Sequence, residues 1–305
     1  MTAHGFWQYL RLKAIVSLIR FFNYLGTRRH LQPSPSCDRK QIRIPSRQLG
    51  RFIDAWIYHP PNYNKDEPRG LVINWHGGGY VMPNLGQDHS FCEQIAREAN
   101  VLVLDADYRK GPEHPFPGAT EDVQDVLRWV QSQPRVFDLD YVALSGFSSG
   151  GNLALVASSE LRREFQDINI RAVYAFYPGT DLSIPSEAKS VPEPIVPIPS
   201  WALRVFFDSY IPQLEDRKSP KASPIYAEES SFPPHILLFI CSGDILCPEA
   251  EVFGQKLSRA GCGIEVVKME GAGHGFDKDA LARVFKPEEK KRAYAKVIQS
   301  LKAIM

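Results

Sequence analysis

The 305-residue sequence predicts an α/β fold in which a mostly parallel sheet is wrapped by helices. From residue 41 onward, short apolar segments alternate with longer segments of helical periodicity. The composition supports a folded protein with a large core, because 44% of the residues are hydrophobic and 23% are charged. Both observations indicate one α/β catalytic domain that carries additional segments.

The expected strands and helices follow this alternation. Two extended segments, 42–44 and 52–58, come first. Further strands are predicted at 71–75, 101–105, 142–146, 172–176, 236–242 and 264–269. Helices are predicted near 88–99, 119–132, 149–163, 249–260 and 287–303.

A proline-rich segment, 181–224, interrupts the alternation. Its prolines are followed by the aromatic run 201–210. Because proline fixes φ and blocks strand pairing, we expect a rigid irregular loop and then a short helix that begins near Pro199 or Ser200. We expect this insertion to lie over the active site, with a surface excursion that has no role as the alternative.

The N-terminal segment, 1–40, predicts a helical cap segment ahead of the catalytic domain, 41–305. Apolar residues at spacings of three and four fall on one helix face: Trp7, Leu10, Ala14, Leu18, Phe21 and Leu25. We expect this face to pack against the rest of the protein, and attachment to a membrane surface is the alternative. Arg11, Lys13 and Arg20 break the apolar run, so neither a transmembrane span nor a cleaved signal is predicted.

Charge and cysteine content exclude other classes of partner. The formal net charge is +1, with no long block of like charge, which argues against nucleic acid. The five scattered cysteines have no metal-ligand spacing and form no disulfide framework, so we expect no metal site and a reduced, cytoplasmic protein. A homodimer is compatible with the sequence.

The motif Gly146-Phe147-Ser148-Ser149-Gly150 lies between an apolar strand and a helical segment. A strand that turns sharply into a helix holds its serine in a strained conformation, with the hydroxyl at the edge of the sheet. The following helix directs its N-terminus at the reacting carbonyl, where it stabilises negative charge. Ser148 is therefore the candidate nucleophile.

A second motif, His76-Gly77-Gly78-Gly79, directly follows the strand at 71–75. Residues without side chains allow backbone N–H groups to approach a substrate closely. We predict an oxyanion hole formed by the N–H groups of Gly77 and Gly78, with Gly79 as a further donor, and by that of Ser149.

A serine nucleophile needs a base and a carboxylate that orients the base. Asp244 follows the strand at 236–242, and His274 follows the last strand. The chain order Ser, Asp, His is the order that this kind of strand, turn and helix arrangement uses. We predict Ser148, His274 and Asp244 as the catalytic triad, with Glu249 as the alternative carboxylate.

On these motifs, the chain resembles the hormone-sensitive lipase group of α/β-hydrolases, which includes bacterial esterases and arylacetamide deacetylases. The resemblance covers roughly residues 40 to 303, and its five ordered matches are His76-Gly77-Gly78-Gly79, Asp107-Tyr108-Arg109 with the segment 112–117, the serine motif with Gly151-Asn152-Leu153-Ala154, Gly243-Asp244-Ile245-Leu246, and His274-Gly275-Phe276. It implies an eight-stranded sheet, with a cap made from the N-terminal segment and an insertion after the sixth strand.

The chain departs from the family pattern at two places. Phe147 stands where the family often has Asp, which raises the question of what provides polar support behind the serine. Lys110-Gly111 replaces the usual Leu-Ala after Tyr-Arg. We interpret the segment 112–117 as a rigid structural turn, with support of the site as the alternative.

The predicted reaction is cleavage of carboxylic esters through an acyl-enzyme, and it needs neither a metal nor an organic cofactor. Trp201, Phe206 and Phe207 predict an apolar pocket for small to medium hydrophobic acids, and Tyr80 and Phe147 are further candidates for its lining. An amidase, a deacetylase or a lactone hydrolase is the enzymatic alternative. Two readings without catalysis are a ligand receptor, as in gibberellin receptors, which lack the triad histidine, and a structural protein.

Overall fold

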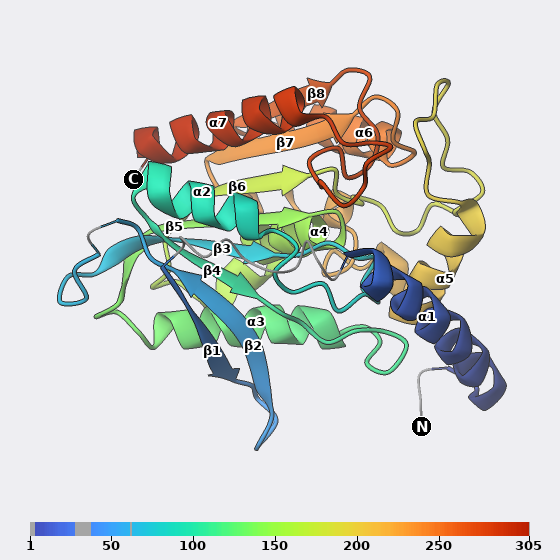
Figure 1. Ribbon diagram of the computed structural model, residues 1–305, viewed down its shortest axis with the longest axis horizontal. Coiled ribbons are helices and arrows are strands. Elements are labelled where there is room, and N and C mark those ends of the chain that lie inside the picture. Colours follow the sequence, from blue (N-terminus) through green and yellow to red (C-terminus); the bar gives the residue numbers. More distant parts are fainter. Residues whose placement is uncertain (1–3, 28–37, 62, 305) are drawn as a thin grey trace.

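The structure is a computed structural model that describes residues 4–27, 38–61 and 63–304. Its strands form one eight-stranded sheet with the order β1-β2-β4-β3-β5-β6-β7-β8 (Figure 1). Their bounds are β1 Arg39–Pro45, β2 Phe52–Tyr58, β3 Arg69–Trp75, β4 Leu102–Ala106, β5 Phe137–Phe147, β6 Ile170–Phe176, β7 His235–Cys241 and β8 Ile264–Met269. β2 pairs antiparallel with β1 and β4, and the other neighbours are parallel. The predicted α/β fold is confirmed.

Seven α-helices accompany the sheet in the described residues. They are α1 Phe6–Thr27, α2 His89–Ala99, α3 Gly118–Gln131, α4 Ser149–Val156, α5 Ser200–Tyr210, α6 Cys247–Arg259 and α7 Pro287–Ile304. Shorter helical turns lie at Ala157–Leu161, Arg162–Glu164, Glu215–Lys218, Pro224–Tyr226 and Glu229–Ser231. The predicted helix 149–163 is therefore α4 followed by a π-helical turn and a 3-10 turn.

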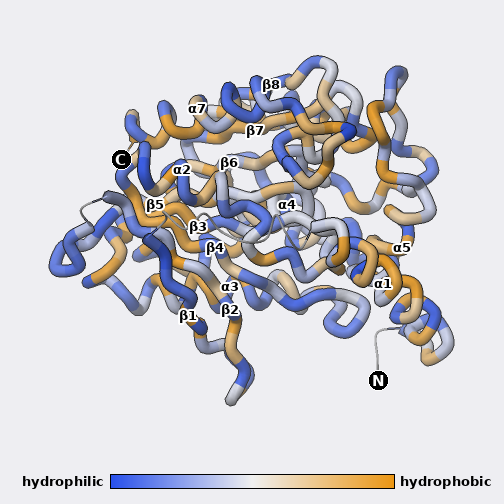
Figure 2. The backbone as a smooth tube through the Cα atoms, viewed as in Figure 1, coloured by the Kyte–Doolittle hydropathy of each residue, from blue (hydrophilic) through white to orange (hydrophobic). Residues whose placement is uncertain are grey.

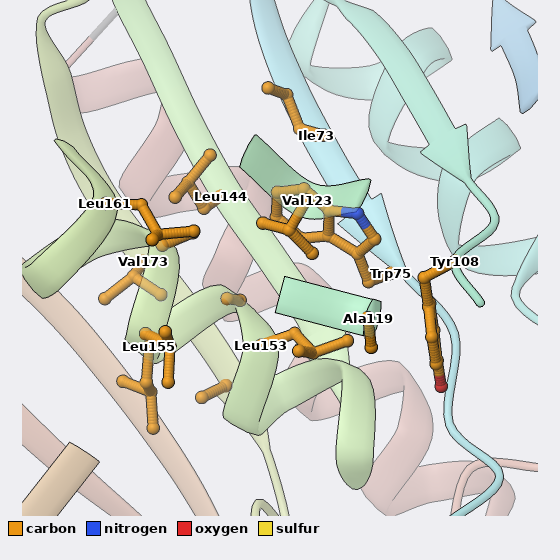
Figure 3. Close-up of a cluster of buried hydrophobic side chains, with 14 of the residues drawn as sticks. Ile73, Trp75, Tyr108, Ala119, Val123, Leu144, Leu153, Leu155, Leu161 and Val173 are labelled. Atoms are coloured by element: carbon orange, nitrogen blue, oxygen red, sulfur yellow. The ribbon is translucent and has the colours of Figure 1, made fainter. Parts of the chain in front are cut away.

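Two apolar cores cover the two faces of the sheet, because successive side chains of a strand point to opposite faces. Along β3, Ile73 and Trp75 lie in the core that α3, α4 and α6 complete. Figure 3 shows this core with Val123 of α3 and Leu153 of α4 against the strands. Val72 lies in the second core, which α2 and α7 cover. Both cores fix the strand ends that carry the site.

Parallel strands bring their carboxyl ends to one edge of the sheet. At that edge β5 leads into α4, β7 leads to residue 244, and β8 leads to residue 274. The segment between β6 and β7 contains α5, which lies beside α1 near this edge (Figure 1). The ends of β5, β7 and β8 and the segment that contains α5 are distant in sequence but therefore lie near the same edge of the sheet.

The N-terminal helix forms as predicted, but the prediction of its packing face is wrong. Trp7 is 79% exposed and Phe21 is 56% exposed, whereas Leu12 and Val16 are buried. Apolar residues occur around most of this helix, so their spacing could not select the packed side. Polar anchors select it: Arg20 donates to the Val81 carbonyl at 2.7 Å, and Asn23 donates to Asn84 at 2.9 Å.

Hydropathy along the chain follows the same arrangement. The central strands are apolar, and α1 is the most apolar helix at the periphery (Figure 2). Among the helices of the described residues, none has both the length and the apolar character that a membrane crossing requires.

Candidate active site

Ser148 lies at the turn between β5 and α4 with φ 52° and ψ −117°. This backbone region is sparsely populated for residues other than glycine and costs on the order of 1–3 kcal/mol. The flanking glycines permit the turn, because a Cβ at Gly146 would collide with the Gly150 carbonyl, and a Cβ at Gly150 with the Trp75 carbonyl. The Ser148 N–H donates to the Phe176 carbonyl at 2.8 Å, which ties the turn to β6.

Ser148, His274 and Asp244 form one chain of hydrogen bonds. The Ser148 hydroxyl lies 2.9 Å from Nε2 of His274, and Nδ1 of His274 lies 2.6 Å from Oδ2 of Asp244. Asp244 is 2% exposed, and its other oxygen accepts the N–H of Leu246 at 3.2 Å. A buried carboxylate at Nδ1 favours the tautomer that leaves Nε2 free to accept the serine proton.

Glu249, the alternative carboxylate, takes part in a different cluster. Its Oε1 accepts the N–H groups of Thr180 and Asp181 at 2.9 and 3.2 Å, and its Oε2 pairs with Lys189. These contacts tie the start of the segment between β6 and α5 to α6. Asp244 occupies the position beside the imidazole of His274. In this structure Asp244, and not Glu249, therefore contacts His274.

The ring of Tyr177 packs edge-on against His274, with 4.8 Å between the ring centroids. The Tyr177 hydroxyl donates to Asp277 at 2.5 Å, which fixes the ring from its far end. Tyr177 was not among the site residues predicted from the sequence. The signal was weak, since Tyr177 only follows a strand without belonging to a recognised motif.

The glycine loop after β3 lies directly against Ser148. A Cβ placed on Gly77 would lie 3.4 Å from the Cβ of Ser148. Gly78 and Gly79 have positive φ values of 129° and 60°, which glycine adopts without strain. Together with Ser149, these three residues line the same cavity as Ser148 and His274. The N–H of Ser149 belongs to the first turn of α4, whose N–H groups have no partner within the helix.

Three side chains hold this loop in place. The Nε2 of His76 lies 3.0 Å from Asp107, and its ring stacks on Tyr108 with 4.8 Å between centroids. The Tyr108 hydroxyl donates to the His76 carbonyl at 3.0 Å and lies 3.2 Å from the Ser149 hydroxyl. Burial alone would raise the pKa of Asp107, but Lys110 and His76 lower it below its ordinary value. Asp107 and Tyr108 belong to the motif after β4 and His76 to the motif after β3, and none of the three was assigned a role from the sequence.

The contacts of Lys110 and Gly111 explain why they replace the Leu-Ala that is usual in the family. The Lys110 ammonium pairs with Asp107 and lies 3.6 Å from the ring centroid of Tyr108. A Cβ at Gly111 would collide with the Ser209 carbonyl of α5, so the close approach requires glycine. The segment that follows binds both peripheral helices: Glu113 pairs with Arg20 of α1 at 2.7 Å, and the Phe116 N–H donates to the last residue of α5 at 2.6 Å.

Lys278 provides polar contacts behind the turn that carries Ser148. Phe147 is fully buried and stacks on Phe176 at 4.4 Å. The Lys278 ammonium lies over the Phe147 ring and pairs with Asp88 at 2.6 Å and with Asp277 at 2.7 Å. Burial alone would lower the pKa of Lys278, but Asp277 and Asp88 raise it above its ordinary value.

A cavity of about 210 Å³ opens at Ser148. Tyr80, Phe147, Phe206 and Phe207 all line it, together with Leu203 and Leu246. Trp201 is 58% exposed in the first turn of α5 and lies outside this lining. The prediction that Trp201 contributes to the pocket is wrong, because α5 turns Phe206 and Phe207 toward the site instead.

Among the described residues, no group of three or more His, Cys, Asp or Glu side chains is arranged to hold a metal ion.

Known proteins share this fold and much of this sequence. A family model of the α/β-hydrolase fold matches residues 72–278. The chain is 32% identical over 229 residues to the esterase LipI of Mycobacterium tuberculosis, which covers 73% of this chain and 71% of that protein. It is 27% identical over 229 residues to ethyl acetate hydrolase of Pseudomonas putida, covering 74% and 72%. The hyperthermophilic esterase of the archaeon Pyrobaculum calidifontis superposes with a TM-score of 0.79 at 27% identity, over 96% of this chain and 93% of that one.

The fold and these relatives define the class of the protein, a carboxylic ester hydrolase. The chain belongs to the α/β-hydrolase family, within its group of hormone-sensitive lipases and carboxylesterases.

Proposed function

We propose that the protein hydrolyses carboxylic esters of small to medium hydrophobic acids through an acyl-enzyme on Ser148. His274 takes the serine proton and returns it to the leaving alkoxide, and Asp244 holds the imidazole in the required tautomer. Water then attacks the acyl-enzyme with His274 again acting as the base. The observation that carries this proposal is the hydrogen-bonded chain from Ser148 to Asp244, at 2.9 and 2.6 Å.

In this mechanism, the tetrahedral intermediate places its oxyanion between the glycine loop and the start of α4. The N–H groups of Gly77, Gly78 and Gly79 and that of Ser149 are the proposed donors. Preorganised donors at this point stabilise charge that develops only in the transition state, which raises kcat rather than affinity. The contacts of Tyr108 with His76 and Ser149 support this role, because they fix both sides of the proposed hole.

An apolar cavity supports hydrophobic acyl groups as substrates. Its lining is mostly aromatic and aliphatic, and its volume of about 210 Å³ suits short and medium chains. We also propose that α1 and the segment 181–224 form the cap over this cavity. Residues of α1 and of α5 contribute to the wall of the cavity, which supports the assignment of both segments to the cap.

The proposal is tested with p-nitrophenyl esters of increasing acyl length, using wild type and Ser148→Ala. We expect turnover only by wild type, and a fluorophosphonate adduct on Ser148 in the mass spectrum. Parallel assays with a p-nitroanilide and a lactone of the same acyl group separate an esterase from an amidase or a lactone hydrolase. Absence of both turnover and label in wild type would exclude the proposed activity.

Acyl-length preference tests the pocket. Phe206→Ala enlarges the cavity, so we expect the optimal chain in kcat/KM to become longer, at about 0.8 kcal/mol for each additional buried methylene. Trp201→Ala is the matched control, because this aromatic residue of the same helix lies outside the lining. An equal shift in both variants would contradict the assigned pocket.

We infer a cytoplasmic location from the cysteines. Cys241, Cys247 and Cys262 are free thiols in the described residues, and the first two are buried. Free thiols are typical of proteins in reducing compartments, which supports this location.

A further inference from the structure

The outer face of α1 is an exposed apolar surface. Eight large apolar side chains of this helix are exposed: Phe6, Trp7, Leu10, Leu18, Phe21, Phe22, Tyr24 and Leu25. Scattered single exposures are ordinary on protein surfaces, but a contiguous apolar face marks a contact with another molecule or with lipid. We call these eight residues the α1 outer face.

The orientation of α1 is fixed by partly buried polar contacts and by one buried apolar side chain. Arg20 binds the Val81 and Gly111 carbonyls at 2.7 and 2.8 Å and both oxygens of Glu113. Val16 is fully buried against Val81 and Met82. Rotation of the helix to bury its outer face would break these contacts. The α1 outer face is therefore directed away from the protein by the fold itself.

The charged side chains of α1 itself are all basic. Arg11 and Lys13 lie on the exposed part of α1, and Lys13 is 3.4 Å from Glu113. The sequence has no acidic residue before Asp38. A cationic helix with Trp, Phe and Tyr on its apolar side has the composition of helices that lie in the interface of anionic membranes.

The same helix forms part of the substrate cavity. Asn23 and Thr27, near its C-terminal end, line the cavity together with Ser148 and His274. The exposed residues Leu25, Tyr24 and Phe22 are their neighbours in the sequence. Contact of the outer face with a bilayer would bring that end of the cavity close to the lipid surface.

We propose that the α1 outer face binds the surface of anionic membranes and lets the enzyme take lipophilic esters from the bilayer. The helix lies in the interface and does not cross the bilayer. Delivery of an ester rests on the function proposed above, whereas binding to lipid does not.

A second copy of the chain is the competing occupant. In a symmetric dimer built on this face, the same surface meets itself, so Arg11 and Lys13 would approach the cations of the other copy. No acidic side chain of α1 would compensate them, because the helix has none. Anionic lipid complements this charge, and for this reason we favour a membrane over self-association.

Sedimentation with vesicles tests the proposal. The protein is mixed at low ionic strength with vesicles of phosphatidylcholine alone or with added phosphatidylserine. We expect binding to the anionic vesicles, and the same binding by Ser148→Ala, which keeps the result independent of esterase activity. Arg11→Gln should weaken binding to the anionic vesicles about fivefold and leave binding to neutral vesicles unchanged.

A pair of matched double variants locates the contact. Leu18→Gln with Phe21→Gln removes two side chains of the α1 outer face and should lower vesicle affinity at least about tenfold. Leu49→Gln with Phe52→Gln changes the same residue types at the same spacing in the β1–β2 hairpin, where both are exposed, and should leave affinity unchanged. Hydrolysis of a water-soluble acetate ester should be normal in both.

The proposal would be overturned if wild type did not bind anionic vesicles at low ionic strength, or if the two double variants bound them equally. It would also be overturned by a third result: wild type is a dimer in sedimentation equilibrium, Leu18→Gln with Phe21→Gln dissociates that dimer, and vesicles bind no protein. The last result would assign the face to a second copy of the chain.

Discussion

The ammonium nitrogen of Lys278 lies 3.3 Å from the ring centroid of Phe147, the residue before the proposed nucleophile. Both side chains are buried, and Asp88 and Asp277 hold the cation in place. Asp277 also accepts hydrogen bonds from the hydroxyls of Tyr177 and Tyr294 at 2.5 and 2.7 Å. One buried charge cluster thus supports both the serine turn and the tyrosine that packs on His274.

Removal of this cation should destabilise the protein strongly. Lys278→Met leaves two buried carboxylates without their counter-ion, and we expect a loss of about 3 to 5 kcal/mol in the free energy of unfolding. Urea denaturation at constant slope measures it. Lys268→Met is the control, since Lys268 pairs with Glu251 at the surface and its loss should cost under about 1 kcal/mol. Similar costs in both variants would contradict a structural role for the cluster.

Two carboxylates near the site should respond differently to neutralisation. Asp244→Asn keeps the geometry but removes the charge that orients His274, so kcat should fall by about 10³ to 10⁴ while the unfolding temperature changes little. Glu249→Gln leaves the buried Lys189 without its ion pair, so the unfolding temperature should fall while kcat at low temperature is retained. The reverse pattern would assign the triad carboxylate to Glu249.

Much of the site was predictable because its motifs follow strand ends. Ser148 directly follows β5, and Asp244 and His274 lie in the loops just after β7 and β8; parallel strands bring such residues to one edge. The packed face of α1 was not predictable in this way. Its orientation depends on Arg20 and Asn23, whose partners lie about 60 or more residues away in sequence.

The support of the serine turn was also hidden from the sequence. Phe147 departs from the family pattern, and only the fold brings Lys278 and Asp88 to it from positions 190 residues apart. Likewise, the predicted strand at 142–146 begins earlier, at Phe137, because parallel pairing with β3 also engages residue 137. Contacts between residues distant in sequence therefore determine the surroundings of Phe147 and the start of β5, which the local sequence pattern does not specify.

The contact between Glu113 and α1 should weaken in acid. Partial burial alone would raise the pKa of Glu113, but Arg20 lowers it from 4.5 to about 2. A depressed pKa means that the ion pair stabilises the fold above pH 4.5, and that this contribution is lost as pH falls toward 2. The difference in unfolding free energy between wild type and Glu113→Gln should therefore shrink over that range. A difference that stays constant from pH 7 to 2 would contradict this linkage.

The Tyr108 hydroxyl joins the two sides of the proposed oxyanion hole, since it donates to the His76 carbonyl and contacts Ser149. In Tyr108→Phe the glycine loop loses this tie, and we expect kcat to fall about 10- to 100-fold with KM little changed, because the donors act in the transition state. Tyr174→Phe is the matched control: its hydroxyl donates to Ser300 at 3.1 Å, in the partly buried contact between β6 and α7. Both variants should lose about 1 kcal/mol of stability, the usual contribution of one hydrogen bond. If kcat falls equally in both, or if Tyr108→Phe raises KM alone, Tyr108 does not position the oxyanion donors.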